Sequence, residues 1–129
     1  MGYISHIDFR VKDAALVLPF YDALFEALGF GRAVPRSAIA TYARWDSDGV
    51  RDEWFNLYED PTCVASATRL AFRAQSREIV DQVHRAVREH ANNIDGPEDL
   101  PRVDPSYYGL FFEDALGNKF ETCHCALRR

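Results

Sequence analysis

The sequence lacks the features that mark membrane, disulfide-stabilised and nucleic-acid-binding proteins. No apolar run approaches the roughly 20 residues of a membrane-spanning helix, and the N-terminus has no charged region followed by an apolar run, as a secretory signal has. Three cysteines in 129 residues, without the spacing of a disulfide scaffold, suit a reducing cytoplasm. The net charge of −5 lacks the surplus of Lys and Arg that phosphates require. We therefore expect a cytoplasmic protein that binds neither nucleic acid nor membrane.

What the sequence contains is the composition of an ordinary folded domain. Hydrophobic residues make up 47% of the chain and charged residues 27%, and there is no low-complexity run. A chain of this length can bury one hydrophobic core. We therefore expect a single domain over residues 1–129.

The first half of the chain predicts one strand, one helix and three further strands. Residues 3–11 alternate as a strand does, and Asp13 is a suitable N-cap for an amphipathic helix over 13–28. Pro19 removes one backbone hydrogen bond from this helix, and Gly29 can end it. Three short strands are expected next, at 31–35, 39–45 and 53–59.

The second half predicts the same order of elements. Residues 69–74 have the pattern of a strand, and Ser76 can cap a helix that runs to about residue 90. One weak strand is expected within 92–105. A hairpin should follow over 107–121, the last pair of strands in the chain.

The terminal hairpin contains the least expected side chain, the carboxylate of Glu121. Asp114 can open its turn and Gly117 can close it in the left-handed conformation. If Phe120 faces the core, alternation places Glu121 and Cys123 on the opposite face of the same strand. A carboxylate in an apolar hairpin needs a partner or a chemical role.

The two halves also repeat in sequence. Residues 6–11 align with 69–74 at an offset of 63, and residues 55–57 align with 120–122 at an offset of 65. Two motifs with nearly the same offset indicate two copies of one β-α-β-β-β unit, because internal repeats rarely arise by chance.

These segments resemble the vicinal oxygen chelate superfamily, which includes glyoxalase I, extradiol dioxygenases and bleomycin-resistance proteins. The similarity lies in the turn at 114–118 followed by Glu121, in Ser5–Val11, in Phe20-Tyr21 and in Leu28-Gly29-Phe30. The usual turn reads Asp-Pro-Asp-Gly-Asn, whereas this chain has Ala and Leu at its second and third positions. The resemblance implies an α+β fold of two βαβββ modules (3–59 and 68–125) that form a half-open barrel, and a homodimer.

The repeat and the resemblance together give four equivalent inward positions, which are His6, Asn56, Arg69 and Glu121. Metal-dependent members of the superfamily typically hold His, Glu, His and Glu there, around Zn²⁺, Ni²⁺, Mn²⁺ or Fe²⁺. Here only His6 and Glu121 match. Asn56 could coordinate weakly through its amide oxygen, and Arg69 has no acceptor atom with which to ligate a metal.

Arg69 predicts a site without metal. A guanidinium about 4 Å from a divalent cation would repel it by roughly 8 kcal/mol at an effective dielectric constant near 20, whereas it could pair with the carboxylate of Glu121. Two alternatives stay open. Arg69 could bend to solvent and leave a two-residue metal site completed by water and substrate, or the strand register could be shifted by one residue, which would change the facing.

Further side chains are expected around a pocket on this face. Arg10 and Arg73 occupy matching repeat positions, Trp54 and Tyr58 share the face of Asn56, and Tyr107 or Tyr108, of which we favour Tyr108, should line the wall. Such a pocket suits a small planar or carboxylate-bearing ligand. The alternative is that the arginines are solvated strand ends and the aromatic rings pack in the core. Cys123 could be a pocket thiol; the segment Cys123-His124-Cys125 is too extended to chelate zinc.

Two classes of function are consistent with these residues. The favoured one is a metal-free binding protein for a small molecule. The alternative is a metal-dependent lyase, isomerase or dioxygenase in which His6 and Glu121 hold the cation and Glu121 acts as general base. A purely structural role has no positive feature to support it, and fold alone cannot decide between the other two.

Overall fold

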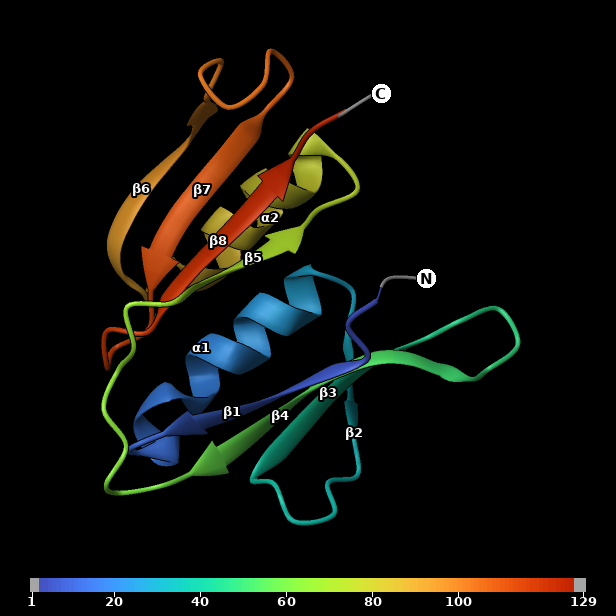
Figure 1. Cartoon of the computed structure of the whole chain (residues 1–129), viewed down its shortest axis with the longest axis vertical. Helices are drawn as coiled ribbons and strands as arrows, with labels where there is room; N and C mark the ends of the chain where they lie inside the picture. The colour runs from blue at the N-terminus through green and yellow to red at the C-terminus, as the bar shows by residue number, and fades with distance from the viewer. Residues whose placement is uncertain (1–2, 127–129) are drawn as a thin grey trace.

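The computed structural model describes residues 3–126, which form two four-stranded mixed sheets and two helices (Figure 1). The first module consists of β1 (His6–Val11), α1 (Ala14–Ala27), β2 (Gly31–Ala33), β3 (Ala40–Trp45) and β4 (Arg51–Glu59). The second module consists of β5 (Arg69–Arg73), α2 (Arg77–Val87), β6 (Asn92–Asp99), β7 (Tyr108–Glu113) and β8 (Lys119–His124). The expected α+β fold of two βαβββ modules is confirmed, and the two sheets do not close on one another. No helix in residues 3–126 has the length and apolarity needed to cross a membrane.

The two sheets have equivalent strand orders, β1-β4-β3-β2 and β5-β8-β7-β6. In each module the first strand runs parallel to the last, so that His6 pairs with Trp54 and Arg69 pairs with Lys119. The equivalent partners differ by 69 − 6 = 63 and 119 − 54 = 65 residues, which are the two offsets of the sequence repeat. The register expected from the sequence is confirmed, and the alternative of a one-residue shift is wrong.

Both helices begin where the sequence predicts. The Asp13 carboxylate accepts a hydrogen bond from the Leu16 amide at 3.2 Å, and the Ser76 hydroxyl accepts one from the Ile79 amide at 3.2 Å. Such caps satisfy amide groups that have no partner within the helix. Helix α1 ends at the expected glycine, since Gly29 has φ +86°. Helix α2 stops at Val87, earlier than predicted, because residues 88–90 form a turn.

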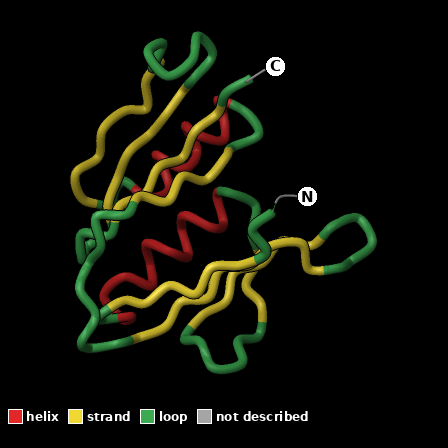
Figure 2. Tube along the Cα trace, viewed as in Figure 1, coloured by secondary structure: helices red, strands yellow, loops and turns green. Residues whose placement is uncertain are grey.

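A single core joins the two modules. Figure 2 shows each helix beside its own sheet, and the helices also contact each other. Aromatic rings from both modules meet in this core: the ring centroids of Phe25 and Phe72 lie 5.5 Å apart, and those of Tyr21 and Phe120 lie 5.7 Å apart. Burial of such large rings supplies much of the stability of a small domain, so the modules form one packed unit.

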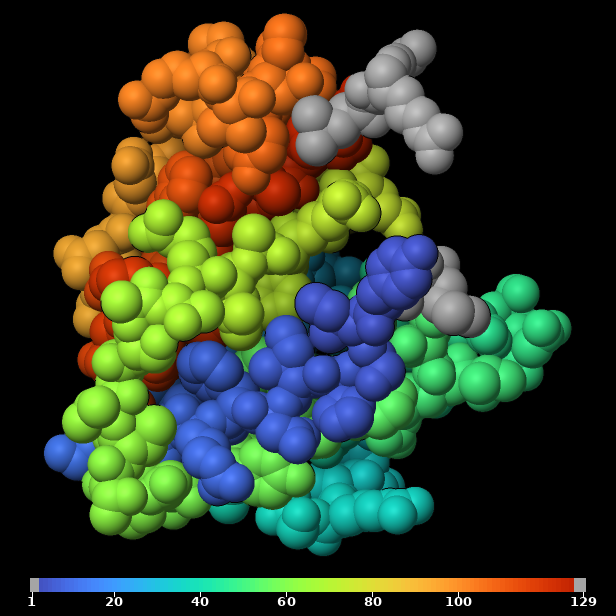
Figure 3. Space-filling view, viewed as in Figure 1, coloured from blue at the N-terminus to red at the C-terminus, as the bar shows by residue number. Residues whose placement is uncertain are grey.

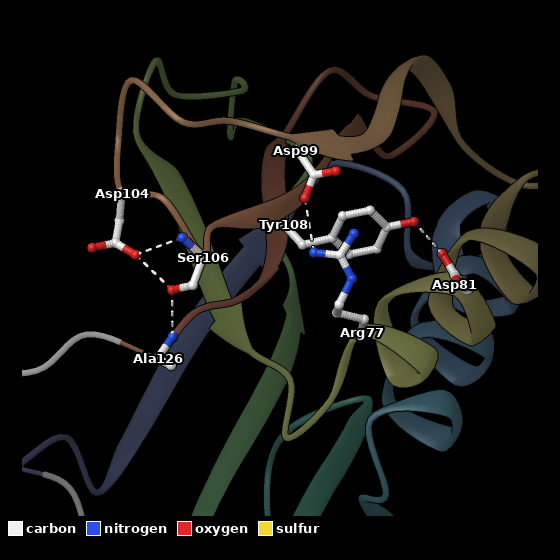
Figure 4. Close-up of polar contacts among 7 residues, drawn as sticks. All are labelled: Arg77, Asp81, Asp99, Asp104, Ser106, Tyr108 and Ala126. Carbon is white, nitrogen blue, oxygen red and sulfur yellow. Dashed lines mark hydrogen bonds and ion pairs between the residues drawn. The ribbon is translucent and has the colours of Figure 1, made fainter.

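The segment between β6 and β7 is fixed to its surroundings by polar contacts (Figure 4). Arg77 at the start of α2 donates a hydrogen bond to Asp99 at 2.8 Å, and its guanidinium carbon lies 4.0 Å from the centre of the Tyr108 ring. The hydroxyl of Tyr108 donates to Asp81 of α2 at 2.6 Å. Ser106 accepts a hydrogen bond from the Ala126 amide at 2.9 Å. The contacts of Arg77 and Tyr108 hold the end of β6 and the beginning of β7 against α2, and the contact of Ser106 joins the loop to the chain that follows β8.

Candidate functional site

The candidate residues lie on the open face of each sheet, by which we mean the side opposite the helix. In β1, Ile7, Phe9 and Val11 pack toward the core, whereas His6, Asp8 and Arg10 are exposed. The same alternation in β8 buries Phe120 and Thr122 on the helix side. It places Glu121 and Cys123 on the open face, as the sequence predicts.

On the open face of the first sheet, His6 and Trp54 form one stacked pair. Their ring centroids are 4.7 Å apart and their planes differ by 6°. The Ser5 hydroxyl oxygen and the His6 Nδ1 atom share a hydrogen bond of 2.8 Å. The orientation of the imidazole is therefore set by the Trp54 ring against its face and by the Ser5 hydroxyl at its Nδ1 atom.

Asn56, on the same face, already uses both ends of its amide. Its Oδ1 atom accepts a hydrogen bond from the Thr41 hydroxyl at 2.8 Å, and its Nδ2 atom donates one to the Asp8 carboxylate at 2.9 Å. Farther along the strands, the Arg10 guanidinium carbon lies 5.4 Å from the centre of the Tyr58 ring. Both residues are on the face that the sequence predicts, and both have partners from within the sheet.

On the open face of the second sheet, the carboxylate of Glu121 has a partner that the sequence did not predict. Glu121 is only 8% exposed and accepts a hydrogen bond from the Tyr107 hydroxyl. The ring of Tyr107 lies over Gly109, where an added Cβ atom would come within 3.2 Å of it. The absence of a side chain at Gly109 lets the tyrosine reach across the sheet.

Burial and the nearby Cys123 and Glu121 raise the pKa of Tyr107, so its hydroxyl stays protonated and can donate. Burial likewise raises the pKa of the Cys123 thiol, and the charge of Glu121 adds to the effect, while the nearby Tyr107 hydroxyl opposes it. Cys123 is therefore a neutral thiol near neutral pH and a poor nucleophile.

Tyr107, and not Tyr108, lies on the open face; the preference for Tyr108 was wrong. Tyr108 points to the helix side, where its hydroxyl donates to Asp81 (Figure 4). The sequence carried the signal for this assignment. Leu110 and Phe112 are buried in the core, and period-two alternation puts Tyr108 on their side and Tyr107 on the other.

The expected ion pair between Arg69 and Glu121 is also wrong. None of the ion pairs within residues 3–126 joins these side chains. In the parallel register, Ala71 lies opposite Glu121 and Arg69 lies opposite Lys119, which is two residues away. The Arg69 guanidinium carbon instead lies 5.0 Å from the centre of the Phe111 ring, a favourable cation–π geometry.

The residues on these faces do not fit a bound metal ion. Within residues 3–126, no three His, Cys, Asp or Glu side chains are grouped so that they could hold one. Of the four equivalent positions, Asn56 has both amide ends bonded and Glu121 is bonded to Tyr107. Arg69 brings a positive charge and no acceptor.

A cavity of about 470 Å³ lies where the two modules meet, between the start of β1 and the whole of β5. Figure 3 shows a hollow between the N-terminal segment and the residues coloured yellow-green. Four of the predicted site residues line this cavity: His6, Trp54, Arg69 and Arg73. The other predicted site residues are not among its lining residues: Arg10, Asn56, Tyr58, Tyr108, Glu121 and Cys123.

Sequence reasoning missed two charged residues of the cavity wall. Arg44 and Glu53 are direct partners across β3 and β4, and their side chains form an ion pair of 3.2 Å. The Arg44 guanidinium carbon lies 5.7 Å from the centre of the Phe30 ring, which also lines the cavity. Opposite charges on adjacent strands are a common stabilising pair, but only the hairpin register shows that these two face each other.

Comparison with known proteins places this fold. The sequence matches no protein-family model and no curated protein. Among solved structures, a glyoxalase/bleomycin resistance protein from Albidiferax ferrireducens T118 is 25% identical in sequence to this chain, with a TM-score of 0.71. The match covers 97% of this chain and 100% of that one.

Two further structures agree with this match. A glyoxalase/dioxygenase from Nostoc punctiforme is 19% identical with a TM-score of 0.64, over 96% of this chain and 91% of that one. A glyoxylase/bleomycin resistance protein/dioxygenase domain from Frankia sp. EAN1pec is 16% identical with a TM-score of 0.64, over 98% and 99% of the two chains. The similarity therefore spans both modules in every case.

Proposed function

Because the chain has the fold of the glyoxalase and bleomycin-resistance proteins of the vicinal oxygen chelate superfamily, we propose that it binds a small planar carboxylate in the cavity between its modules, without a metal ion. The observation that carries this proposal is the presence of Arg69 and Arg73 in the cavity wall beside aromatic rings. Neither arginine takes part in an ion pair within residues 3–126. Both are exposed on the open face, so each can donate to a ligand.

The size and lining of the cavity agree with a small organic anion. A volume of about 470 Å³ lies in the usual range of ligand pockets, roughly 300–1,000 Å³. Trp54 and Phe72 supply flat apolar surface, which favours a planar group. A guanidinium can bind a carboxylate through two parallel hydrogen bonds, and this geometry gives both affinity and orientation.

A metal-dependent reaction has less support. The alternative of a lyase, isomerase or dioxygenase needs His6 and Glu121 to act on one ligand. His6 lines the cavity, whereas Glu121 is 8% exposed, is bonded to Tyr107 and is absent from the lining. No observation therefore favours this reaction class over binding.

The proposal can be tested with benzoate and benzamide, which have nearly the same shape and differ in charge. The variant Trp45→Phe leaves Trp54 as the single tryptophan, so its fluorescence reports on the cavity. In this background benzoate should change the emission at lower concentration than benzamide. Replacing Arg69 or Arg73 with Gln should weaken benzoate binding about tenfold or more, because hydrogen bonds to charged groups contribute about 1.5–3 kcal/mol.

Arg85→Gln is the matched control, since Arg85 is exposed on α2 and does not line the cavity. It removes the same charge from the molecule and should leave benzoate binding unchanged. Equal binding of benzoate and benzamide, or an equal loss in all three arginine variants, would overturn the proposal. Titration calorimetry of the parent protein gives the same comparison without the fluorescent reporter.

A further inference from the structure

A second cavity adjoins the first and shares part of its wall. It has a volume of about 200 Å³ and lies between the end of α1 and the turn that leads from β5 into α2. Four residues line both cavities: Leu28, Arg44, Arg73 and Gln75. The two cavities are therefore adjacent and have this part of their walls in common.

The two arginines that line both cavities differ in whether they have an ion-pair partner. Arg44 forms an ion pair with Glu53 and lies against the Phe30 ring. Arg73 takes part in none of the ion pairs within residues 3–126. One positive charge in excess thus stands at the junction, which suits one negative charge on a ligand.

The residues that line the second cavity alone have apolar side chains or, for glycine, none. Ala27, Gly29, Ala74 and Ile79 line it together with the shared residues, and none of these four carries a charge. Its volume suits a small aliphatic group, whereas the first cavity offers aromatic surface from Trp54 and Phe72. Apolar groups gain free energy on leaving water for such a surface.

From this arrangement we infer that the ligand has two apolar parts on either side of one carboxylate. A planar ring lies in the larger cavity, the carboxylate lies at Arg73, and a short aliphatic group lies in the smaller cavity. N-aroyl derivatives of aliphatic amino acids have this chemistry. The inference rests on the proposed function and adds the substrate class and the role of the second compartment.

N-benzoylglycine and N-benzoyl-L-leucine provide the test, because they share the ring and the carboxylate and differ by one isobutyl group. Titration calorimetry of the full chain should show the leucine derivative binding about tenfold tighter or more, since even one additional methylene group in an apolar pocket is worth about tenfold. The variant Ile79→Phe fills the smaller cavity and should abolish this preference. N-benzoylglycine has no side chain to place in the smaller cavity and is the reference compound for this variant.

Ile79→Ala is the matched second variant, since it enlarges the same cavity. It should still bind both compounds. It should also bind N-benzoyl amino acids with side chains longer than that of leucine more tightly than the parent protein does. Thermal melting of each variant verifies that it is folded. Equal affinity for the two compounds, or a preference that survives Ile79→Phe, would overturn the inference and leave the proposed function standing. If neither compound nor benzoate binds, the proposed function itself fails.

Discussion

The hydroxyl of Tyr21 donates a hydrogen bond of 2.7 Å to the carboxylate of Asp114, across 93 residues of sequence. Both side chains are fully buried. Asp114 also accepts hydrogen bonds from the backbone amide of Leu116 and from the backbone and side-chain amides of Asn118. One carboxylate therefore closes the terminal turn and connects it to the helix of the first module. Burial and the charge of Asp114 raise the pKa of Tyr21, so this donor stays protonated.

Replacing Tyr21 with Phe should lower the free energy of unfolding by about 1–3 kcal/mol, because a buried carboxylate then loses one of its donors. The ring and its packing in the core are kept. Urea unfolding should show a lower midpoint with an unchanged slope, since the surface exposed on unfolding stays the same.

Tyr58→Phe is the control for this prediction. Its hydroxyl lies 3.5 Å from the Ser37 hydroxyl near the surface, too far for a strong hydrogen bond. The expected loss is within about 0.5 kcal/mol. Equal stability of the Tyr21 and Tyr58 variants would contradict the role assigned to the contact with Asp114.

The sequence predicts the fold well because its local signals agree with one another. The caps at Asp13 and Ser76, the Asp114–Asn118 turn and the two repeat offsets all depend on short-range chemistry or on alternation. Each has the expected effect in the structure. Strand facing follows from the same alternation, so it could be predicted for His6 and Glu121.

The partners of the site residues could not be predicted in the same way. Alternation along the strands places Arg69 and Glu121 on the same side of the sheet. Which side chain Arg69 contacts depends on its position opposite Lys119, two residues from Glu121, and on the nearby Phe111 ring. The bond from Tyr107 to Glu121 depends on the space above Gly109. The cavity depends on the angle between the two modules, which no pattern within one module specifies.

The reactivity of Cys123 should depend on pH in a defined direction. Burial and the charge of Glu121 raise the pKa of its thiol, so at about pH 8.5, where an ordinary thiol is half ionised, less thiolate is present in the folded protein. Alkylation by iodoacetamide, followed at this residue by peptide mass spectrometry, should be slower in the folded chain than in urea. The neutral thiol thus stabilises the folded state below the pKa of the unfolded thiol, and this contribution is lost as pH rises through the folded pKa.

Tyr107→Phe sharpens this experiment. The nearby Tyr107 hydroxyl lowers the Cys123 pKa against the larger effect of burial, so its removal should slow alkylation further. Cys63, which lies elsewhere in the chain and contacts the Arg10 carbonyl oxygen, serves as the internal reference in the same digest. Faster alkylation of Cys123 in the variant would show that the tyrosine shields the thiol sterically instead of tuning its pKa.

The chain should form a homodimer. Within residues 3–126, strands β1, β2, β5 and β6 each end a sheet and have one unpaired edge, and apolar side chains of the first module, including Val34 at 89% and Val50 at 60%, are exposed. A partner related by two-fold symmetry can cover such surfaces. Light scattering at micromolar concentration should give about twice the chain mass of 14.7 kDa. A mass equal to one chain over a wide range of concentration would contradict the prediction.

The unmodified protein should not bind a divalent cation tightly at the four equivalent positions. Arg69 adds a positive charge there, the Asn56 amide is bonded at both ends, and Glu121 accepts a hydrogen bond from Tyr107. A metal ion that binds only the folded state, at a free concentration of one hundred times its Kd, would add about 2.7 kcal/mol to the free energy of unfolding. This corresponds to a rise in Tm of roughly 10 °C for a domain of this size. Protein purified without a histidine tag should therefore melt at the same temperature with Mn²⁺, with Ni²⁺ and with a chelator.

Tyr107→Phe is the informative comparison, because it frees Glu121 and leaves Arg69 and Asn56 in place. If the variant also gains no stability from metal, the positive charge of Arg69 and the fully hydrogen-bonded amide of Asn56 are sufficient to exclude the cation. If the parent protein binds one metal ion per chain and gains several degrees, the metal-free site is wrong, and the metal-dependent reaction class becomes the better interpretation of His6 and Glu121.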